Sequence, residues 1–308
     1  MESPKIRLPR PAPPGAVIGV CAPAGPVHEP ELHEGLAWLE EAGYRVRCGE
    51  HLRTRRGYLA GTDEERLSDL LALVRAPEVD AILLARGGYG VGRLLRRLDA
   101  EEFRAARKVV IGYSDATLLQ TFLLQCAGLA SIHGPMFDRS DTTEAARERL
   151  LALLRGETEG TPLKGQPLKP GCARGRLVGG NLSVVLASLG TPWEIDTRGA
   201  ILFFEERGEA LYRIDRMLVQ LRDAGKLADV AGVAFGKLVG CETERYPEPV
   251  AAEVVREVVL PEVSGPVLVD LPFGHVADNH ALGVGIEAEL DGNSGSLALL
   301  GPVVEDTA

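Results

Sequence analysis

The sequence has few of the features that mark several large classes of protein. Its five cysteines are scattered, odd in number and include no CxxC pair, which argues against a disulfide framework and against a zinc site. No apolar run is long enough to span a bilayer, and prolines occupy the N-terminal stretch where a signal peptide needs an apolar core. We therefore expect a cytoplasmic protein with no membrane contact, no metal and no cofactor.

The sequence also has fewer basic than acidic residues. The 308 residues include 34 Lys and Arg against 44 Asp and Glu, which gives a formal net charge of −10 at pH 7. Binding to nucleic acid needs clustered Lys and Arg, and the one basic cluster, Arg53, Arg55 and Arg56, is short. The composition therefore predicts a small-molecule partner and no nucleic acid.

What the chain does contain is an alternation of predicted strands and helices. Short apolar runs at 16–21, 81–85 and 109–111 have the length of buried parallel strands, and 44–48 is a further predicted strand. Leucines recur between them at helical spacing, and a capping box opens one of these helices at Thr62 with Glu65 three residues later. A further helix is expected around 92–98. The alternation predicts an α/β fold, an open parallel sheet with helices on both faces.

The length favours two domains. Residues 157–175 are rich in glycine and proline and have hardly any apolar periodicity, which is typical of a linker. We predict an N-terminal α/β domain at 1–156, a linker at 157–175 and a second domain of mixed α and β structure at 176–308. A terminal hairpin is expected at 290–300.

One predicted strand turns directly into a helix at Gly112-Tyr113-Ser114-Asp115. A serine on such a turn projects from the sheet edge at a helix N-terminus, where backbone N–H groups can hold an oxyanion, as in a nucleophile elbow. Ser114 is therefore the candidate nucleophile. A second interpretation stays open, because Ser and Asp are favoured as helix N-caps and Ala116 replaces the second glycine of the elbow pattern G-x-S-x-G.

A serine nucleophile needs a base within hydrogen-bond reach and an acid that orients the base. Of the six histidines, His133 and His275 each follow a predicted strand, and these two are the candidates for the base. Glu205 ends the apolar strand at 201–204, where a partly buried carboxylate needs a partner, so it is the candidate acid. Each of these side chains could equally have a structural role, and spacing does not separate the two interpretations.

The glycine-rich loop RGGYG at 86–90 follows another predicted strand. Its glycines permit positive φ and a close approach of the backbone to a ligand. Ligands of open parallel sheets bind beyond the carboxyl ends of the strands, where both this loop and Ser114 fall. A non-enzymatic protein that binds a phosphate or a sugar nucleotide on this loop is an alternative, but it gives no role to Glu205 and His275.

A series of short motifs extends over nearly the whole chain. In order they are RGGYG at 86–90, IGYSDAT at 111–117, HGPM at 133–136, GGNL at 179–182, LFFEE at 202–206, YRIDRML at 212–218 and LPFGH at 271–275. No single motif is specific, but the ordered set resembles the LD-carboxypeptidase family of serine peptidases. The resemblance implies a flavodoxin-like N-terminal domain, a smaller β-rich C-terminal domain and a cytoplasmic homodimer.

The resemblance also implies roles for particular residues. The family's nucleophile matches Ser114, its acid matches Glu205 and its base matches His275, while the backbone N–H groups of Gly88 and Asp115 match its oxyanion hole. The implied reaction is acyl transfer that removes the terminal D-Ala from murein tetrapeptides, or from related small peptides, during cell-wall recycling.

Two further points follow from the resemblance. Arg86 is a candidate for holding the terminal carboxylate of the substrate, although it could equally be structural. A sister branch of the family, the microcin C immunity-like hydrolases, cleaves the carboxamide of aminoacyl or peptidyl adenylates with the same triad. In that alternative Trp193 would stack on the nucleobase of the adenylate, and otherwise it belongs to the core.

Overall fold

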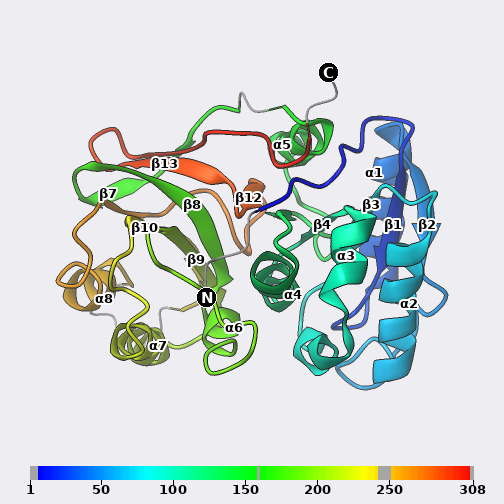
Figure 1. Cartoon of the computed structure of the whole chain (residues 1–308), viewed down its shortest axis with the longest axis horizontal. Helices are drawn as coiled ribbons and strands as arrows, with labels where there is room; N and C mark the ends of the chain where they lie inside the picture. Colours follow the sequence, from blue (N-terminus) through cyan, green and yellow to red (C-terminus); the bar gives the residue numbers. More distant parts are fainter. Residues whose placement is uncertain (1–5, 158–159, 242–250, 306–308) are drawn as a thin grey trace.

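The computed structural model describes residues 6–157, 160–241 and 251–305 and shows two β-sheets next to one another, each covered by helices (Figure 1). The first part of the chain forms β1 (Val17–Cys21), α1 (Glu29–Glu41), β2 (Arg45–Cys48), α2 (Asp63–Arg75), β3 (Ala81–Leu84), α3 (Ala100–Ala106), β4 (Val109–Gly112), α4 (Ala116–Phe122), β5 (Ser131–His133) and α5 (Glu144–Arg155). The rest forms β6 (Leu163–Lys164), β7 (Gln166–Lys169), β8 (Cys172–Asn181), α6 (Leu182–Leu186), β9 (Ile201–Arg207), α7 (Leu211–Asp223), β10 (Gly232–Val239), α8 (Ala251–Val258), β11 (Val267–Val269), β12 (Leu282–Val284), β13 (Glu287–Asp291) and β14 (Ser296–Leu299).

The six-stranded sheet has the order β12-β5-β4-β3-β1-β2, and β1 to β5 pair in parallel. The order of the five parallel strands is that of flavodoxin-like folds, which confirms the expected fold class. The strand β12 comes from near the C-terminus and pairs antiparallel with β5. The far end of the chain is thus hydrogen-bonded to the first sheet.

Alternation of side chains along the strands explains why helices cover both faces of this sheet. In β1, Ile18 and Val20 pack in a cluster with leucines of α1 and α5. On the opposite face of the sheet, Val17 and Cys21 pack in a second cluster with leucines of α2 and α4 and with Phe103 of α3. The capping box predicted at the start of α2 is present.

The eight-stranded sheet has the order β6-β14-β13-β8-β9-β10-β11-β7. Its centre, β8 to β11, is parallel, and β13, β14, β6 and β7 pair antiparallel around it. The strand β9 is buried from Ile201 to Glu206 and belongs to the core that α6, α7 and α8 cover. This mixed sheet is the expected second, β-rich part, and β13 with β14 is the expected terminal hairpin.

Two expectations on local structure need comment. The helix expected around 92–98 is a pair of 3-10 turns, Val91–Arg93 and Leu95–Arg97, because Gly90 precedes it at φ +140° and the segment is too short for a stable α-helix. In the segment expected to be a linker, of which residues 158–159 lie outside the described parts, the chain forms β6, β7 and the start of β8. The domain boundaries stay a prediction.

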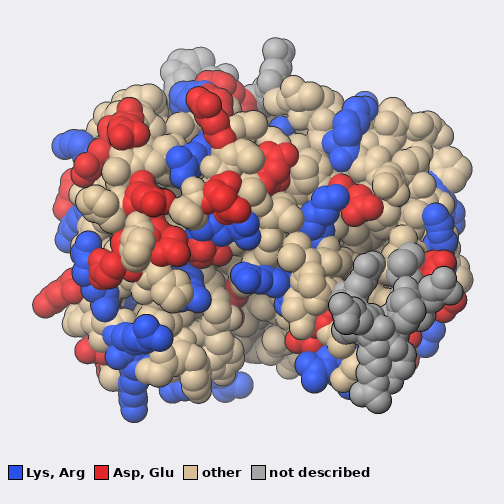
Figure 2. All heavy atoms as spheres, turned by 180° about the vertical axis from the view of Figure 1, so that it is seen from behind, with Lys and Arg blue, Asp and Glu red and all other residues tan. Residues whose placement is uncertain are grey.

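On the face opposite to that of Figure 1, lysines and arginines lie next to aspartates and glutamates, most densely in the left half of the view (Figure 2). The five cysteines are free thiols. Across the described ranges, no helix combines the length and the hydropathy needed to cross a membrane.

Candidate active site

Ser114 lies on the turn that joins β4 to α4, and its backbone has φ +61°. This left-handed conformation costs an L-residue about 1–2 kcal/mol and often marks a functional position. Asp115, the N-cap residue of α4, makes no side-chain cap hydrogen bond, and no hydrogen bond of the Ser114 hydroxyl to the helix is present in the described part of the chain. The capping interpretation of this turn is therefore wrong.

The Asp115 carboxylate faces the glycine-rich loop instead. It is buried and accepts a hydrogen bond from the backbone N–H of Val91 at 2.8 Å. Burial raises the pKa of this carboxyl group to about 6, although the Val91 bond and the charge of Arg66 act in the opposite direction. Asp115 thus joins the Ser114 turn to the loop after β3.

The same loop touches Ser114 directly at Gly87. A Cβ atom placed on Gly87 would lie 2.7 Å from the Cβ atom and 2.8 Å from the Oγ atom of Ser114, so only glycine fits there. The next residue, Gly88, is exposed and has φ +102°. Among the described residues, neither the Gly88 nor the Asp115 backbone N–H donates a hydrogen bond to the protein. Both groups are therefore available as donors beside the serine.

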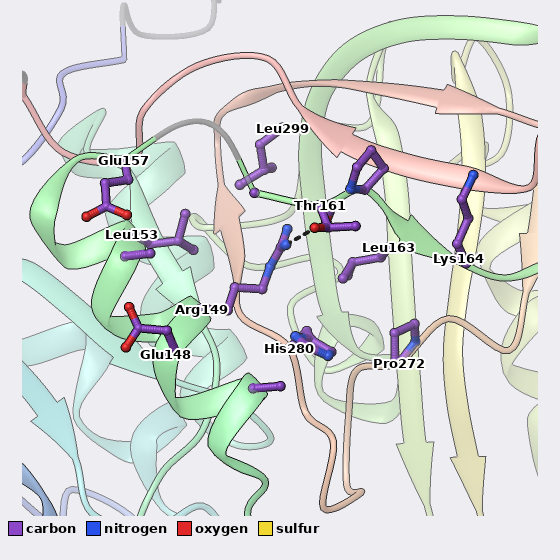
Figure 3. A pocket seen from close by; sticks show the side chains of 14 residues that line it. Glu148, Arg149, Leu153, Glu157, Thr161, Leu163, Lys164, Pro272, His280 and Leu299 are labelled. Carbon is purple, nitrogen blue, oxygen red and sulfur yellow. Dashed lines mark hydrogen bonds between the residues drawn. The ribbon is translucent and has the colours of Figure 1, made fainter.

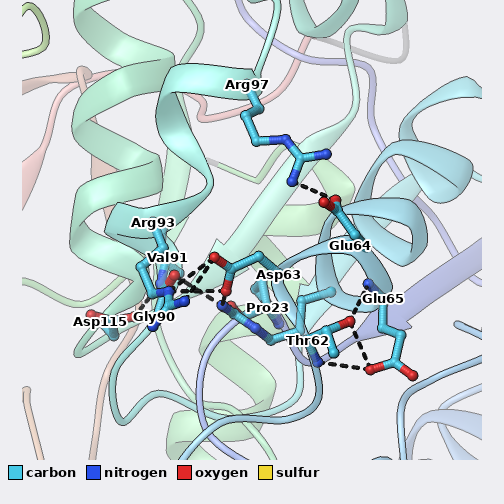
Figure 4. Close-up of polar contacts among 11 residues, drawn as sticks. Pro23, Thr62, Asp63, Glu64, Glu65, Gly90, Val91, Arg93, Arg97 and Asp115 are labelled. Atoms are coloured by element: carbon cyan, nitrogen blue, oxygen red, sulfur yellow. Dashed lines mark hydrogen bonds and ion pairs between the residues drawn. The ribbon is translucent and has the colours of Figure 1, made fainter.

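A buried arginine that sequence reasoning missed, Arg66, holds these loops in place, and its partners Pro23, Asp63 and Gly90 are labelled in Figure 4. Arg66 of α2 donates from Nη1 to the carbonyl oxygens of Pro23 and of Gly90, the latter at 3.0 Å, and from Nη2 to Asp63 at 2.6 Å. Arg93 also binds Asp63. In the sequence, Arg66 is only a charged residue next to the apolar stripe of α2, and this pattern is too common to indicate a buried arginine.

Glu205 and His275 form a buried pair. The Nδ1 atom of His275, in the loop after β11, lies 2.6 Å from Oε2 of Glu205 in β9. Glu205 is 0% exposed and His275 is 8% exposed. Gly274 makes this contact possible, because a Cβ atom there would lie 2.7 Å from the Cβ of Glu205.

The environment of His275 makes it a better base than a free imidazole. Burial alone would lower the pKa of the ring, but the hydrogen bond and the charge of Glu205 outweigh burial and leave the pKa raised above its usual 6.5. The bond at Nδ1 also leaves Nε2 as the basic nitrogen of the neutral ring.

Tyr113 connects the two halves of the site. Its ring lies edge-on to that of His275 with 4.8 Å between centroids, and its hydroxyl donates to Asp138 at 2.5 Å. From the same loop as Asp138, Arg139 donates to the backbone carbonyl of His275 at 3.3 Å. The residue directly before Ser114 thus contacts the histidine of the Glu205–His275 pair.

The other candidate base, His133, has no acid partner. It is fully buried at the end of β5, and neither ring nitrogen has a hydrogen-bond partner among the described residues. Burial lowers the pKa of this ring to about 4. Its ring packs on Phe203 and Tyr113, with centroids 5.2 Å and 5.9 Å away. The structure therefore pairs Glu205 with His275.

Arg86 lines a hollow of about 550 Å³ that Gly88 also borders. Its Nη1 atom donates to the carbonyl of Pro26 at 2.6 Å and lies 2.7 Å from Nε2 of His28. Trp193, by contrast, is buried in the core cluster of the first sheet and offers no exposed stacking surface.

A second hollow, of about 420 Å³, lies between α5 and residues 160–164 (Figure 3). Arg149 crosses it and donates to the carbonyl of Thr161 at 2.9 Å. His280 lines this hollow with Nε2 3.2 Å from Asp278, so it is not a partner of Glu205. Within the described ranges, no cluster of three or more His, Cys, Asp or Glu could hold a metal ion.

Two family models match the chain. One is described as the LD-carboxypeptidase N-terminal domain and covers residues 18–134, and the other is described as the LD-carboxypeptidase C-terminal domain and covers residues 174–290. The first match includes Ser114, and the second includes Glu205 and His275.

Individual proteins are similar over most of the chain. A Bacillus subtilis protein named "Probable murein peptide carboxypeptidase" is 40% identical over 90% of this chain and 89% of its own. The murein tetrapeptide carboxypeptidase of Pseudomonas aeruginosa is 31% identical over 90% and 93% of the two chains. The crystal structure of muramoyltetrapeptide carboxypeptidase from Oxalobacter formigenes matches with a TM-score of 0.83 and 30% identity over 92% and 98%. The microcin C7 self-immunity protein MccF of Escherichia coli is more distant, with 25% identity over 90% of each chain.

Proposed function

The chain belongs to the LD-carboxypeptidase family, and from this premise we propose that it hydrolyses the L,D-peptide bond of murein tetrapeptides and releases the terminal D-Ala. The observation that carries the proposal is the buried Glu205–His275 pair, which packs against the residue next to Ser114. A protein that only binds a ligand on the glycine-rich loop would need neither this pair nor a strained serine.

In the proposed reaction, Nε2 of His275 accepts the proton of the Ser114 hydroxyl while Oγ attacks the carbonyl carbon of the L-centred residue. Glu205 accepts the Nδ1–H hydrogen bond and stabilises the imidazolium ion. The C–N bond then breaks, and the imidazolium gives its proton to the leaving D-Ala amine. Water, activated by the same base, hydrolyses the acyl-enzyme and restores the serine.

We assign the oxyanion hole to the backbone N–H groups of Gly88 and Asp115. Both flank Ser114 without a partner in the described protein, and fixed donors of this kind are worth about 10²–10³ in kcat each. For the terminal carboxylate we propose Arg86, because it lines the hollow next to Gly88 and its contacts with Pro26 and His28 use only its Nη1 atom.

We further propose that the protein works in the cytoplasm, in cell-wall recycling, and as a homodimer. Light scattering coupled to size-exclusion chromatography would test the last point directly. A mass of one chain at working concentrations would contradict it.

The test of function compares three substrates. The protein is incubated with a murein tetrapeptide that ends in D-Ala, with the same peptide ending in L-Ala, and with an aminoacyl-sulfamoyl adenylate. Release of D-Ala alone is the expected result, because a mismatched stereoisomer leaves buried polar groups unpaired at about 1–3 kcal/mol each. Cleavage confined to the adenylate would instead assign the protein to the microcin-immunity branch, for which buried Trp193 offers no stacking surface.

A further inference from the structure

The hollow beside Gly88 is larger than the proposed leaving group requires. Its volume of about 550 Å³ falls in the range of roughly 300–1,000 Å³ that is typical of pockets for drug-sized ligands. If Arg86 holds the terminal carboxylate, the side chain of the terminal residue enters the same hollow. The methyl group of D-Ala would leave most of this space to water.

The charge of the lining is one-sided. Arg55 and Arg86 line the hollow, and no Asp or Glu does, although the chain as a whole has a net charge of −10. Arg55 is exposed and has no ion-pair or hydrogen-bond partner for its side chain among the described residues, whereas the nearby Arg53 pairs with Glu29 at 3.3 Å. An unpaired guanidinium in a hollow without carboxylates is suited to an anion.

Two tyrosines form a wall of the same hollow. Tyr58 is 67% exposed and Tyr89 is 54% exposed, and their ring centroids lie 5.9 Å apart. They are two of the few large hydrophobic side chains that are exposed in the described parts of the chain. Aromatic rings in this position can pack on the methylene groups of a side chain whose charged end reaches Arg55.

We infer that this hollow is a subsite for the side chain of the terminal D-residue and that it accepts acidic side chains as large as D-glutamate, with Arg55 as the residue that determines this specificity. The inference rests on the proposed function, because it places the terminal residue by means of Arg86. It extends the substrate class from peptides that end in D-Ala to peptides that end in acidic D-amino acids.

The experiment uses two tetrapeptides that differ only in the last residue, D-Glu or D-Gln, which are nearly identical in shape. Wild-type protein should have the higher kcat/KM for the D-Glu peptide, and Arg55→Gln should lower the D-Glu to D-Gln ratio about tenfold, as expected for one charge-assisted contact. The neighbouring Arg56 is exposed and does not line the hollow, so Arg56→Gln is the matched control and should leave the ratio unchanged.

The tyrosine wall gives a second readout. Tyr89→Ala should lower kcat/KM for the D-Glu and D-Gln peptides alike, and Tyr89→Phe should restore most of the loss because it keeps the ring. If the protein releases D-Ala but Arg55→Gln leaves the D-Glu to D-Gln ratio intact, the subsite is disproved while the proposed function stands.

Failure of the proposed function is recognised separately, as absence of D-Ala release by the wild type. Calorimetry then decides the inference, with the D-Glu and D-Gln peptides titrated into Ser114→Ala protein with and without Arg55→Gln. Tighter binding of the D-Glu peptide that disappears with Arg55→Gln supports the subsite, and equal binding of both peptides overturns it.

Discussion

The ring of Tyr113 lies edge-on to the ring of His275, with 4.8 Å between their centroids. This contact joins the residue before Ser114 to the histidine that Glu205 binds, and so links the turn after β4 to the loop after β11. The orientation of the imidazole therefore depends on both sheets. A serine hydrolase built in this way should lose activity when the two parts of the chain no longer pack together.

The raised pKa of His275 predicts the acid side of the pH profile. In the proposed mechanism the neutral ring is the active base, so kcat/KM should fall as the pH drops through a midpoint above 6.5. Glu205→Gln removes the charge that raises the pKa, and the midpoint of the His275 ring should then move to lower pH in an NMR titration. Glu287→Gln changes an exposed carboxylate on β13 and serves as the control. An unshifted midpoint in Glu205→Gln would argue against this electrostatic account.

Two substitutions of Ser114 separate chemistry from strain. Ser114→Ala and Ser114→Gly should both reduce kcat by about 10⁴-fold or more, because the nucleophile is lost. Glycine adopts φ +61° without strain, whereas alanine does not. The free energy of unfolding of Ser114→Gly should therefore exceed that of Ser114→Ala by about 0.5–1 kcal/mol. Denaturant titration measures this difference. Ser68→Ala on the exposed side of α2 is the control, and turnover at wild-type level in either Ser114 variant would eliminate the serine mechanism.

Gly87→Ala should impair catalysis more than folding. The added methyl group would meet both side-chain atoms of Ser114 at less than 3 Å and displace the nucleophile, which we expect to lower kcat by about 10²-fold. Gly301→Ala is the control, since a Cβ atom there meets no atom within 4 Å. Activity of Gly87→Ala within twofold of the wild type would show that the loop can shift to accommodate the methyl group without displacing Ser114.

Treatment with EDTA should leave the activity unchanged. The proposed nucleophile is a side-chain oxygen activated by His275, so no step needs a metal-bound water. The measurement is kcat before and after dialysis against EDTA. Loss of activity that zinc restores would reject the triad.

Local patterns in the sequence were enough to predict much of the first sheet. Buried strands of a parallel sheet are short apolar runs, and helices that cover them repeat leucines at helical spacing, so both can be read from neighbouring residues. The start of α2 was predicted for the same reason, since Thr62 and Glu65 form the capping box through contacts within one turn. The segment at 92–98 was predicted less well, because glycines at its start favour 3-10 turns over an α-helix.

Spacing alone did not separate His133 from His275, and it was the family resemblance that favoured His275; the tertiary structure supplies the physical reason. Both histidines follow strands, and only the packing of β9 against the loop after β11 brings one of them to Glu205, 70 positions away in sequence. The side-chain hydrogen bonds of Asp115 and Arg66 could not be predicted for the same reason, because their partners lie on loops that come together only in the folded chain.

The sequence by itself thus determined the strand and helix order and the turn that carries Ser114, because these depend on contacts between residues close in the chain. The tertiary structure showed how Glu205 meets His275, which loop covers the serine, and that Arg55, without a partner among the described residues, lines a hollow. Those relationships depend on burial and on contacts between segments far apart in the chain, and no local pattern records them.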